Sequence, residues 1–361
     1  MKCCSGCFQS AEIKYLIESK QALSQCDLCG QVAVPCVDAR ELIFNFTPLL
    51  DLYDTSEHGR PLENRLLSDF PDSIFSNLDE ERVKRLLDAI FADDADATSK
   101  YLGQPVVLAC EEDGERKEEI TKLVTTWERF CNEIKTENRF HIKNSLDLDR
   151  LRTLLSVIES NVPAGRILYR ARICAEDGLT AGDMGQPPRS KARGGRANPE
   201  GISYLYLASD EATAIHEVRA GLLDYVCVGE FQLKEAISII DLMDIGKKDP
   251  FAFVGTLEGS SALENFIAFR PFLSKLGEEL SRPLRPSDSE LDYIPTQYLT
   301  EFIKSQGYAG VRYGSAQRPN GHNFAIFNPE KFECIRINLK EVDRIDLSIK
   351  AVRVEGSDAT N

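Results

Sequence analysis

The chain has 361 residues, 42% of them hydrophobic and 28% charged, which is ordinary for a globular protein with a packed core. Its formal net charge of -15 argues against broad binding to nucleic acid, because such binding depends on neutralising phosphates. No apolar run is long enough to cross a bilayer, and the N-terminus lacks the apolar core of a secretory signal. We therefore expect a cytoplasmic protein without membrane contact, long enough for two domains and a small added module.

Cysteines crowd the N-terminus, where six of the eleven lie within the first 36 residues. Two Cys-x2-Cys pairs are separated by eighteen residues, namely Cys4 with Cys7 and Cys26 with Cys29. This spacing is typical of a structural zinc ribbon, in which each pair forms a tight turn that offers two thiolates. We expect these four cysteines to hold Zn2+ in a module of residues 1–37, with free reduced thiols as the alternative. Cys3 or Cys36 could replace a neighbouring ligand, and the spacing leaves that choice open.

Residues 38–160 are expected to form a mainly helical domain. Leu78–Ala92 and Glu115–Lys135 each begin with acidic residues and place apolar residues along one helical face. The acidic strings at 93–96 and 111–115 are expected to be solvated loops between helices. The aromatic residues of this region are expected to pack in the core rather than to stack on a ligand.

Beyond a Pro-Gly boundary at Asn161–Gly165, strands alternate with helices. This change predicts a mixed α/β domain over residues 161–340, and an α+β fold for the chain as a whole. Strands are expected at Arg166–Ile173, Ile202–Ala208, Tyr225–Leu233, Ile237–Leu242, Gly310–Tyr313 and Asn323–Phe327. Helices are expected at Asp210–Leu222, Ser260–Leu280 and Ile294–Ser305, and residues 341–361 are expected to be a tail with a frayed end.

A local island of positive charge opens this second domain. Arg166–Arg196 contains seven Lys or Arg residues against three acids, although the whole chain is acidic. Glycines and prolines accompany these arginines, as in a loop that must approach a ligand closely. Because a guanidinium binds anionic groups through two parallel hydrogen bonds, the island predicts a loop that holds an anionic ligand.

Five segments occur in a fixed order here: Tyr169-Arg170, GGRANPEGISYLYLAS (194–209), TAIHEVR (213–219), DYIPTQYLTEFIKSQGYAGVRYGSA (292–316) and GHNFAIFNP (321–329). Over most of Arg166–Pro329 they resemble the RES domain family. The N-terminal half is similar to the zinc-ribbon and helical module, grouped with HEPN-type domains, that precedes some RES domains. The resemblance implies a fold related to ADP-ribosyltransferases, degradation of NAD, and a toxin whose partner is an Xre-type DNA-binding antitoxin.

The resemblance also implies four catalytic residues, which are Arg170, Tyr206, Glu217 and Ser315. Cleavage of the nicotinamide–ribose bond develops positive charge on the ribose, which a carboxylate such as Glu217, in the first turns of its helix, can stabilise. Tyr206 could stack on nicotinamide or ribose, and Ser315 could place its hydroxyl on a phosphate or on the attacking water.

Further residues are expected to contact the ligand. Arg193 and Arg196 would join Arg170 in binding the pyrophosphate, and Asn323 would bind the ligand or brace its loop. His216 is expected to have a packing or surface role, because neighbouring residues of a helix point in different directions. His322 is a weaker candidate for the site.

These residues predict an NAD glycohydrolase that releases nicotinamide and ADP-ribose and depletes cellular NAD. An ADP-ribosyltransferase would use the same site and differ only in the nucleophile. A third possibility is a zinc-dependent binding or regulatory module, in which the ribbon and helices recognise nucleic acid or a partner protein, although the acidic N-terminal half argues against nucleic acid. The N-terminal half could also sense a signal or form a homo-oligomer. A HEPN-type ribonuclease is not expected, because Arg139 and His141 are too closely spaced for its motif.

Overall fold

The computed structural model describes residues 1–254, 259–282 and 290–345. Its largest element is an eight-stranded mixed sheet in the order β13-β9-β7-β8-β12-β11-β10-β6. Its strands are β6 (Glu159–Val162), β7 (Ile167–Cys174), β8 (Leu205–Ala208), β9 (Tyr225–Leu233), β10 (Ile237–Asp241), β11 (Gly310–Gly314), β12 (His322–Ile326) and β13 (Phe332–Glu341). All neighbouring pairs are antiparallel except β10 and β11. Together with the helices, this sheet confirms the predicted α+β fold.

The sheet extends past the elements expected from the sequence at both edges. β13 pairs with β9 along its whole length, and β6 pairs with β10 across residues 159–162. The expected boundary at Asn161–Gly165 therefore overlaps a strand of this sheet. Part of the expected tail, residues 342–345, is described, and the frayed end predicted for residues 354–361 lies outside the described residues.

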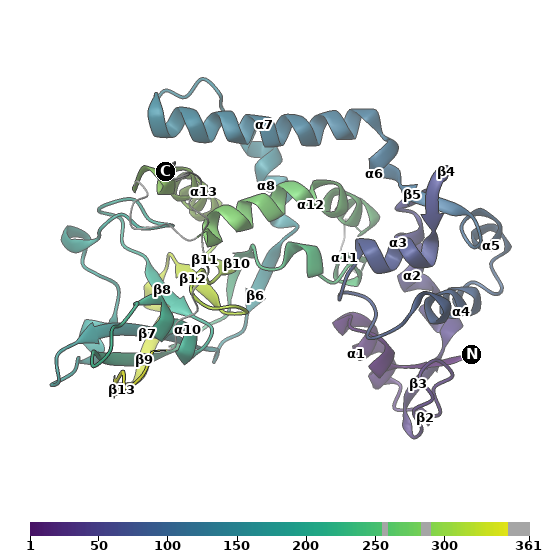
Figure 1. Ribbon diagram of the computed structural model, residues 1–361, viewed down its shortest axis with the longest axis horizontal. Coiled ribbons are helices and arrows are strands. Elements are labelled where there is room, and N and C mark those ends of the chain that lie inside the picture. Colours follow the sequence, from purple (N-terminus) through teal and green to yellow (C-terminus); the bar gives the residue numbers. More distant parts are fainter. Residues whose placement is uncertain (255–258, 283–289, 346–361) are drawn as a thin grey trace, which may run out of the picture.

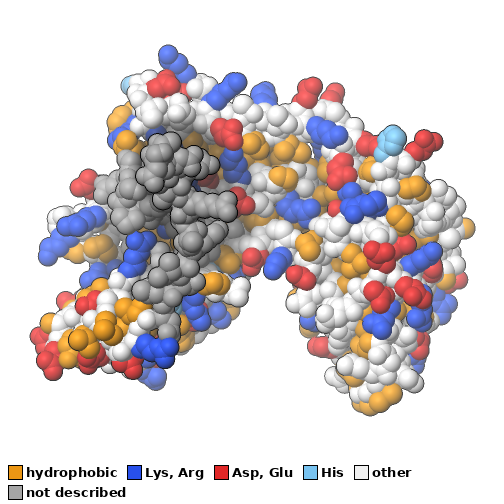
Figure 2. Space-filling view, viewed as in Figure 1, with side chains coloured by type: hydrophobic (Ala, Val, Ile, Leu, Met, Phe, Trp, Pro, Cys, Tyr) orange, Lys and Arg blue, Asp and Glu red, His pale blue; other side chains and the backbone are white. Residues whose placement is uncertain are grey.

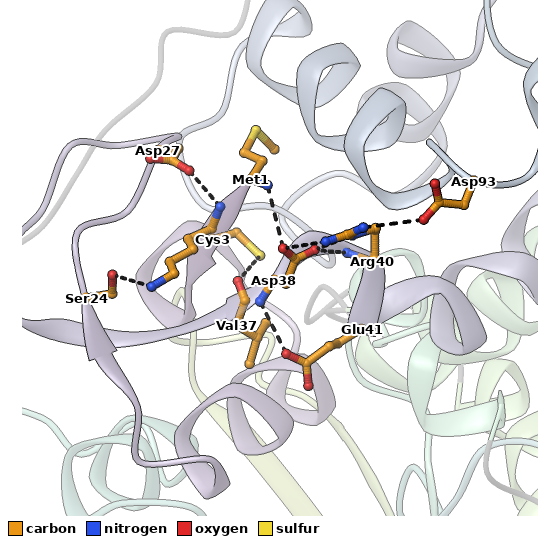
Figure 3. A network of polar contacts seen from close by, with 10 residues as sticks. Met1, Cys3, Ser24, Asp27, Val37, Asp38, Arg40, Glu41 and Asp93 are labelled. Atoms are coloured by element: carbon orange, nitrogen blue, oxygen red, sulfur yellow. Dashed lines mark hydrogen bonds and ion pairs between the residues drawn. The ribbon is translucent and has the colours of Figure 1, made fainter.

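The N-terminal module is a small three-stranded sheet of β1 (Lys2–Cys4), β2 (Leu23–Ser24) and β3 (Val34–Asp38), with the helix α1 (Ala11–Ser19). Polar contacts fix its first strand at the chain terminus, as Figure 3 shows. The Lys2 amide donates to Asp27 at 2.7 Å, and the Met1 amine lies 3.8 Å from Asp38. Hydrogen bonds from Arg40 lower the pKa of Asp38 to about 2, so this carboxylate is charged at neutral pH.

The middle of the chain is mainly helical, as expected. α4 (Glu80–Ile90) and α7 (Gly114–Thr136) confirm the two helices predicted there, and α2 (Ile43–Leu50), α3 (Leu62–Asp69) and α8 (Leu148–Ser156) are further helices of this region. A two-stranded sheet of β4 (Tyr53–Pro61) and β5 (Pro105–Leu108) was not expected. Its polar strand β4 has little apolar alternation, and its pairing partner lies more than forty residues away, so local sequence gives no signal for it.

The prediction that the two acidic strings form solvated loops is wrong. Residues 95–96 begin the short helix α5 (Ala95–Lys100), which Asp94 caps, and residues 111–115 include parts of α6 (Ala109–Glu112) and α7. Asp94 accepts a hydrogen bond from the Ala97 amide at 2.9 Å, and Asp113 accepts one from the Glu115 amide at 3.0 Å. These acids suit a helix N-terminus, because a carboxylate there accepts hydrogen bonds from the unpaired backbone N–H groups and is stabilised by the positive end of the helix dipole.

Two helices connect the two halves of the molecule. α12 (Gly259–Ser281) and α13 (Ile294–Ser305) confirm the predicted helices of the second domain, and α7 runs alongside both of them (Figure 1). Trp127 of α7 stacks on Phe130 and meets the edge of Phe272 of α12, with ring centroids 5.6 and 6.5 Å apart. Trp127 is 1% exposed, so the predicted core role of this aromatic residue is confirmed.

The N-terminal module also contacts the second half directly. The Asp249 carboxylate accepts hydrogen bonds from the Ser10 hydroxyl at 2.7 Å and from the Ala11 amide at 2.9 Å, at the start of α1. Figure 2 shows one lobe formed by the N-terminal module and its helices and another formed by the sheet, with a notch between them. Among the described helices, none has the length and apolarity that a membrane crossing requires.

Candidate active site

The candidate site lies where two adjacent strands separate. β7 and β8 share a single register pair, Tyr169 with Ala208, whereas β7 pairs with β9 along all eight of its residues. A cavity of about 280 Å³ lies beside this junction. It is lined by Tyr169, Arg170, Ala171, Arg196, Tyr206, Leu207, Ala208, Ala214, Glu217, Val218, Tyr313 and Asn323. Five of the seven site residues predicted from the sequence thus line one cavity, and Ser315 and Arg193 do not.

Arg170, in the middle of β7, lines this cavity with a guanidinium that has no acidic partner among the described residues. Its Nη1 is buried and has no hydrogen-bond partner, and no described acid forms an ion pair with it. Burial, and to a lesser degree Arg172, lowers the pKa of Arg170 to about 10, so its guanidinium is charged at neutral pH. A buried donor without a partner is costly, and an anionic ligand in the cavity would satisfy it.

The loop of residues 193–198, which we call the arginine loop, delivers a second cation. Arg196 lines the cavity and donates from Nη1 to the Leu280 carbonyl at 3.0 Å, at the end of α12. Arg193 is exposed, and its side chain is not part of the cavity wall. The structure therefore brings Arg170 and Arg196 together and leaves Arg193 outside.

Tyr206 on β8 holds the arginine loop beside the cavity. Its hydroxyl donates to Asn198 Oδ1 at 2.6 Å and accepts from the Ala197 amide at 3.1 Å. Burial raises the pKa of Tyr206 to about 12, so the hydroxyl keeps its proton. A Cβ on Gly195 would lie 2.7 Å from Asn198 Oδ1 and 3.1 Å from the Tyr206 hydroxyl, so a side chain at this point would displace the pair that holds the loop.

Glu217 is held from one side only. Its Oε1 accepts hydrogen bonds from the Ser315 hydroxyl at 2.6 Å and from Asn323 Nδ2 at 2.7 Å. Within the described part of the chain, its Oε2 accepts no hydrogen bond. The carboxylate is thus oriented by two donors and keeps one oxygen for a ligand.

The helix that carries Glu217 is shorter than expected. α10 spans Glu211–Glu217, so the prediction of Asp210–Leu222 is wrong at its C-terminal end, and Glu217 is the last helical residue rather than one in the first turns. Arg219 has a φ of 50°, in the left-handed region that ends a helix. A helix C-terminus disfavours a carboxylate, and the two donors offset that effect.

Sequence reasoning missed two residues of the site. Tyr313 is 3% exposed, lines the cavity from β11 and lies opposite Asn323 in the sheet register. Asn198 is 4% exposed and also donates from Nδ2 to the Arg193 and Ile202 carbonyls, which closes the arginine loop. Tyr313 lies in the segment 292–316, where the alternation of a strand could have indicated its inward side chain. Asn198 lies in the segment 194–209, where the Asn-Pro pair could have indicated a turn.

Neither histidine considered from the sequence reaches the cavity. His216 is exposed on α10, in accord with the expected surface role. His322 has its Nε2 3.0 Å from Arg312 Nη2, and burial together with this guanidinium lowers the pKa of the imidazole.

Four cysteine thiols form a separate cluster in the N-terminal module. The Sγ atoms of Cys4, Cys7, Cys26 and Cys29 all lie within 4.8 Å of one another and could hold a metal ion. Adjacent Sγ atoms are 3.6 to 3.7 Å apart, too far for a disulfide. Tetrahedral bonds of about 2.3 Å from a metal to each sulfur place the sulfurs about 3.8 Å apart, so the geometry fits a tetrahedral metal.

Comparison with known families matches residues 167–349, about half of the chain, to the RES domain. The chain therefore belongs to the RES domain family, which confirms the predicted resemblance. Among solved structures, the M. tuberculosis MbcT–MbcA toxin–antitoxin complex is similar at 14% identity with a TM-score of 0.34, over 54% of this chain and 94% of the matched chain. No curated protein matches the chain.

Replacing Tyr206 by Phe removes only the hydroxyl that joins β8 to the arginine loop. Because Asn198 Oδ1 is then buried without its donor, we expect the free energy of unfolding to fall by about 1–3 kcal/mol. Denaturant unfolding measures this change. The control is Tyr225→Phe on β9, whose hydroxyl forms no hydrogen bond with the described residues. Equal stability of the two variants would show that Tyr206 does not hold the loop.

Proposed function

We propose that the cavity between β7 and β8 binds NAD and cleaves its nicotinamide–ribose bond, releasing nicotinamide and ADP-ribose. The observation that carries this proposal is the pairing of two cations with one oriented carboxylate around a single small cavity. Arg170 and Arg196 would bind the pyrophosphate, because each has guanidinium N–H groups available at the cavity. Membership of the RES domain family supports the choice of NAD among phosphorylated ligands.

Glu217 would act on the ribose. As the bond to nicotinamide breaks, positive charge develops at the ribose C1′ and ring oxygen, and a nearby carboxylate lowers the energy of that state. Nicotinamide leaves as a neutral molecule and takes the bonding electrons, so no general acid is needed. Water then adds to C1′ and loses a proton, which gives ADP-ribose with a free hydroxyl.

Ser315 and Asn323 would position the carboxylate rather than touch the phosphates. Both donate to Glu217 Oε1, which restricts the rotation of the carboxylate and leaves Oε2 for the ribose. The aromatic rings of Tyr206 and Tyr313 line the cavity and offer a surface for the nicotinamide or ribose.

The cellular role that we propose is that of a toxin that depletes NAD, as the family resemblance implies. An antitoxin of the Xre type would be its protein partner. Control by a separate protein is chemically reasonable for an enzyme that destroys a cofactor every cell needs. A homo-oligomer is the other assembly that the sequence suggests.

In the N-terminal module we propose a structural zinc ion bound by Cys4, Cys7, Cys26 and Cys29. Four thiolates close the coordination shell, so the ion would have no open position for a substrate. Its effect would be to join the two turns of the module, since the enclosed core of so small a sheet is limited.

The catalytic proposal predicts distinct effects for substitutions around the cavity. Glu217→Gln should lower kcat for nicotinamide release about a thousandfold, because the amide cannot stabilise the developing charge. Arg170→Lys should chiefly raise KM for NAD, since an ammonium lacks the bidentate geometry. Chromatography of nicotinamide and ADP-ribose after incubation of the full chain with NAD measures both. Glu211→Gln, on the same helix but paired with Lys340 at the surface, is the matched control.

Nicotinamide and ADP-ribose in equal amounts support hydrolysis. Nicotinamide without matching free ADP-ribose would instead support the transferase. A Glu217→Gln variant as active as Glu211→Gln would contradict the assignment of the carboxylate.

The zinc proposal predicts one zinc per chain by elemental analysis of the purified protein. Cys26→Ser should lose the metal and unfold at a lower temperature, by about 1 °C for each kcal/mol lost in a chain of this length. Cys110→Ser, a free cysteine outside the cluster, should keep both the zinc and the melting temperature. A full zinc content in Cys26→Ser would show that another residue supplies the ligand.

A further inference from the structure

The arginine loop is held along its backbone by the helix α13. Its carbonyl groups at Gly195, Arg196 and Ala197 are consecutive, and each accepts a hydrogen bond from a side chain of α13. Gln297 Nε2 donates to the Gly195 carbonyl at 2.8 Å, and Thr296 Oγ1 donates to the Arg196 carbonyl at 2.6 Å. Thr300 Oγ1 donates to the third. The position of Arg196 therefore follows the position of α13.

α13 is supported in turn by a helix from the other half of the chain. The ring of Tyr298 lies 4.7 Å, centroid to centroid, from the ring of Phe130 on α7, and Phe130 is fully buried. Lys135, near the end of α7, forms an ion pair of 3.1 Å with Asp292, just before α13 begins. α7 thus contacts α13 by both a buried aromatic pair and a charged pair.

The guanidinium of Arg196 is linked to α7 by a second route. Its Nη1 donates to the Leu280 carbonyl, at the end of α12. α12 is tied to α7 by ion pairs of Lys275 with Glu128 and of Glu264 with Arg116. Figure 1 shows α7 lying across both helices. The backbone and the side chain of Arg196 are therefore held by two helices that share one support.

We propose that Gln297, and behind it Phe130 and Lys135 of α7, are positioning residues that set Arg196 for binding the pyrophosphate. α7 spans Gly114–Thr136 and lies outside the matched residues 167–349. The N-terminal half of this chain therefore contributes to the phosphate side of the cavity without touching the ligand. This inference rests on the proposed function, because it assigns the supports of the same site.

The geometry separates this effect from bond cleavage. Glu217 is held by Ser315, which directly follows β11, and by Asn323, which lies on β12. Gln297 instead donates its hydrogen bond to the arginine loop, and among the described residues no hydrogen bond joins Gln297 or α7 to Glu217, Ser315 or Asn323. Weakening these supports should therefore raise KM for NAD and the Kd of ADP-ribose by the same factor, and leave kcat unchanged.

The test uses the full-length, metal-loaded protein and two measurements, NAD turnover and ADP-ribose binding by calorimetry. Gln297→Met keeps the length of the side chain and removes the donor, and should raise both KM and the Kd of ADP-ribose about fivefold. Lys135→Met removes the ion pair with Asp292 with little risk to the fold, and should also raise KM and the Kd of ADP-ribose. Lys122→Met, an exposed lysine of the same helix, should change neither value.

A double-mutant cycle then separates positioning from general loosening. In an Arg196→Ala background, Gln297→Met should have no further effect on the Kd of ADP-ribose, because its target is gone. If Gln297→Met weakens ADP-ribose binding by the same factor in the wild-type and Arg196→Ala backgrounds, or lowers kcat at constant KM, the inference is overturned. An unchanged Kd of ADP-ribose in Gln297→Met would also overturn the inference, whereas NAD cleavage by the wild type would still support the proposed function. A wild type that binds ADP-ribose without cleaving NAD refutes the cleavage alone, and one that binds no ADP-ribose refutes both.

Discussion

The separation of the neighbouring strands β7 and β8, which share only one register pair, is the constraint on which the rest of the site depends. These neighbouring strands share one register pair, so they form few backbone hydrogen bonds with each other, and an unpaired guanidinium and an oriented carboxylate lie beside this opening. β9 supports β7 along its full length, and β12 supports β8. The eight-stranded sheet therefore holds open a polar cavity that its own strands do not fill.

The cavity carries charged groups of both signs, and different side chains form hydrogen bonds to each. On one side, Ser315 and Asn323 fix one oxygen of Glu217, which suits a group that must meet a developing positive charge. On the other side, Arg196 is held by α12 and α13, and these helices pack on α7 of the N-terminal half. The N-terminal half therefore packs on the two helices that form hydrogen bonds to Arg196, although only the second half carries the residues that line the cavity.

Much of this arrangement was predictable from the sequence, and the exceptions share a cause. Periodicity predicted α4, α7, α12 and α13, and the ordered motifs predicted that Arg170, Tyr206 and Glu217 meet. The strand β4, the early end of α10 and the bond from Ser315 to Glu217 were missed. Each of these depends on a partner distant in sequence or on a single left-handed residue, which local patterns do not encode. Asp94 and Asp113 were read as loop acids because capping and solvation use the same residue types.

The most direct test of the account is to incubate the full-length protein with NAD in water enriched in 18O and to analyse the products by mass spectrometry. Hydrolysis at the ribose predicts one 18O atom in free ADP-ribose and none in nicotinamide, with both products formed about a thousandfold more slowly by Glu217→Gln. NAD that stays intact with folded, metal-loaded protein would contradict the central claim. Unlabelled ADP-ribose attached to a macromolecule would keep the site but replace water as the nucleophile.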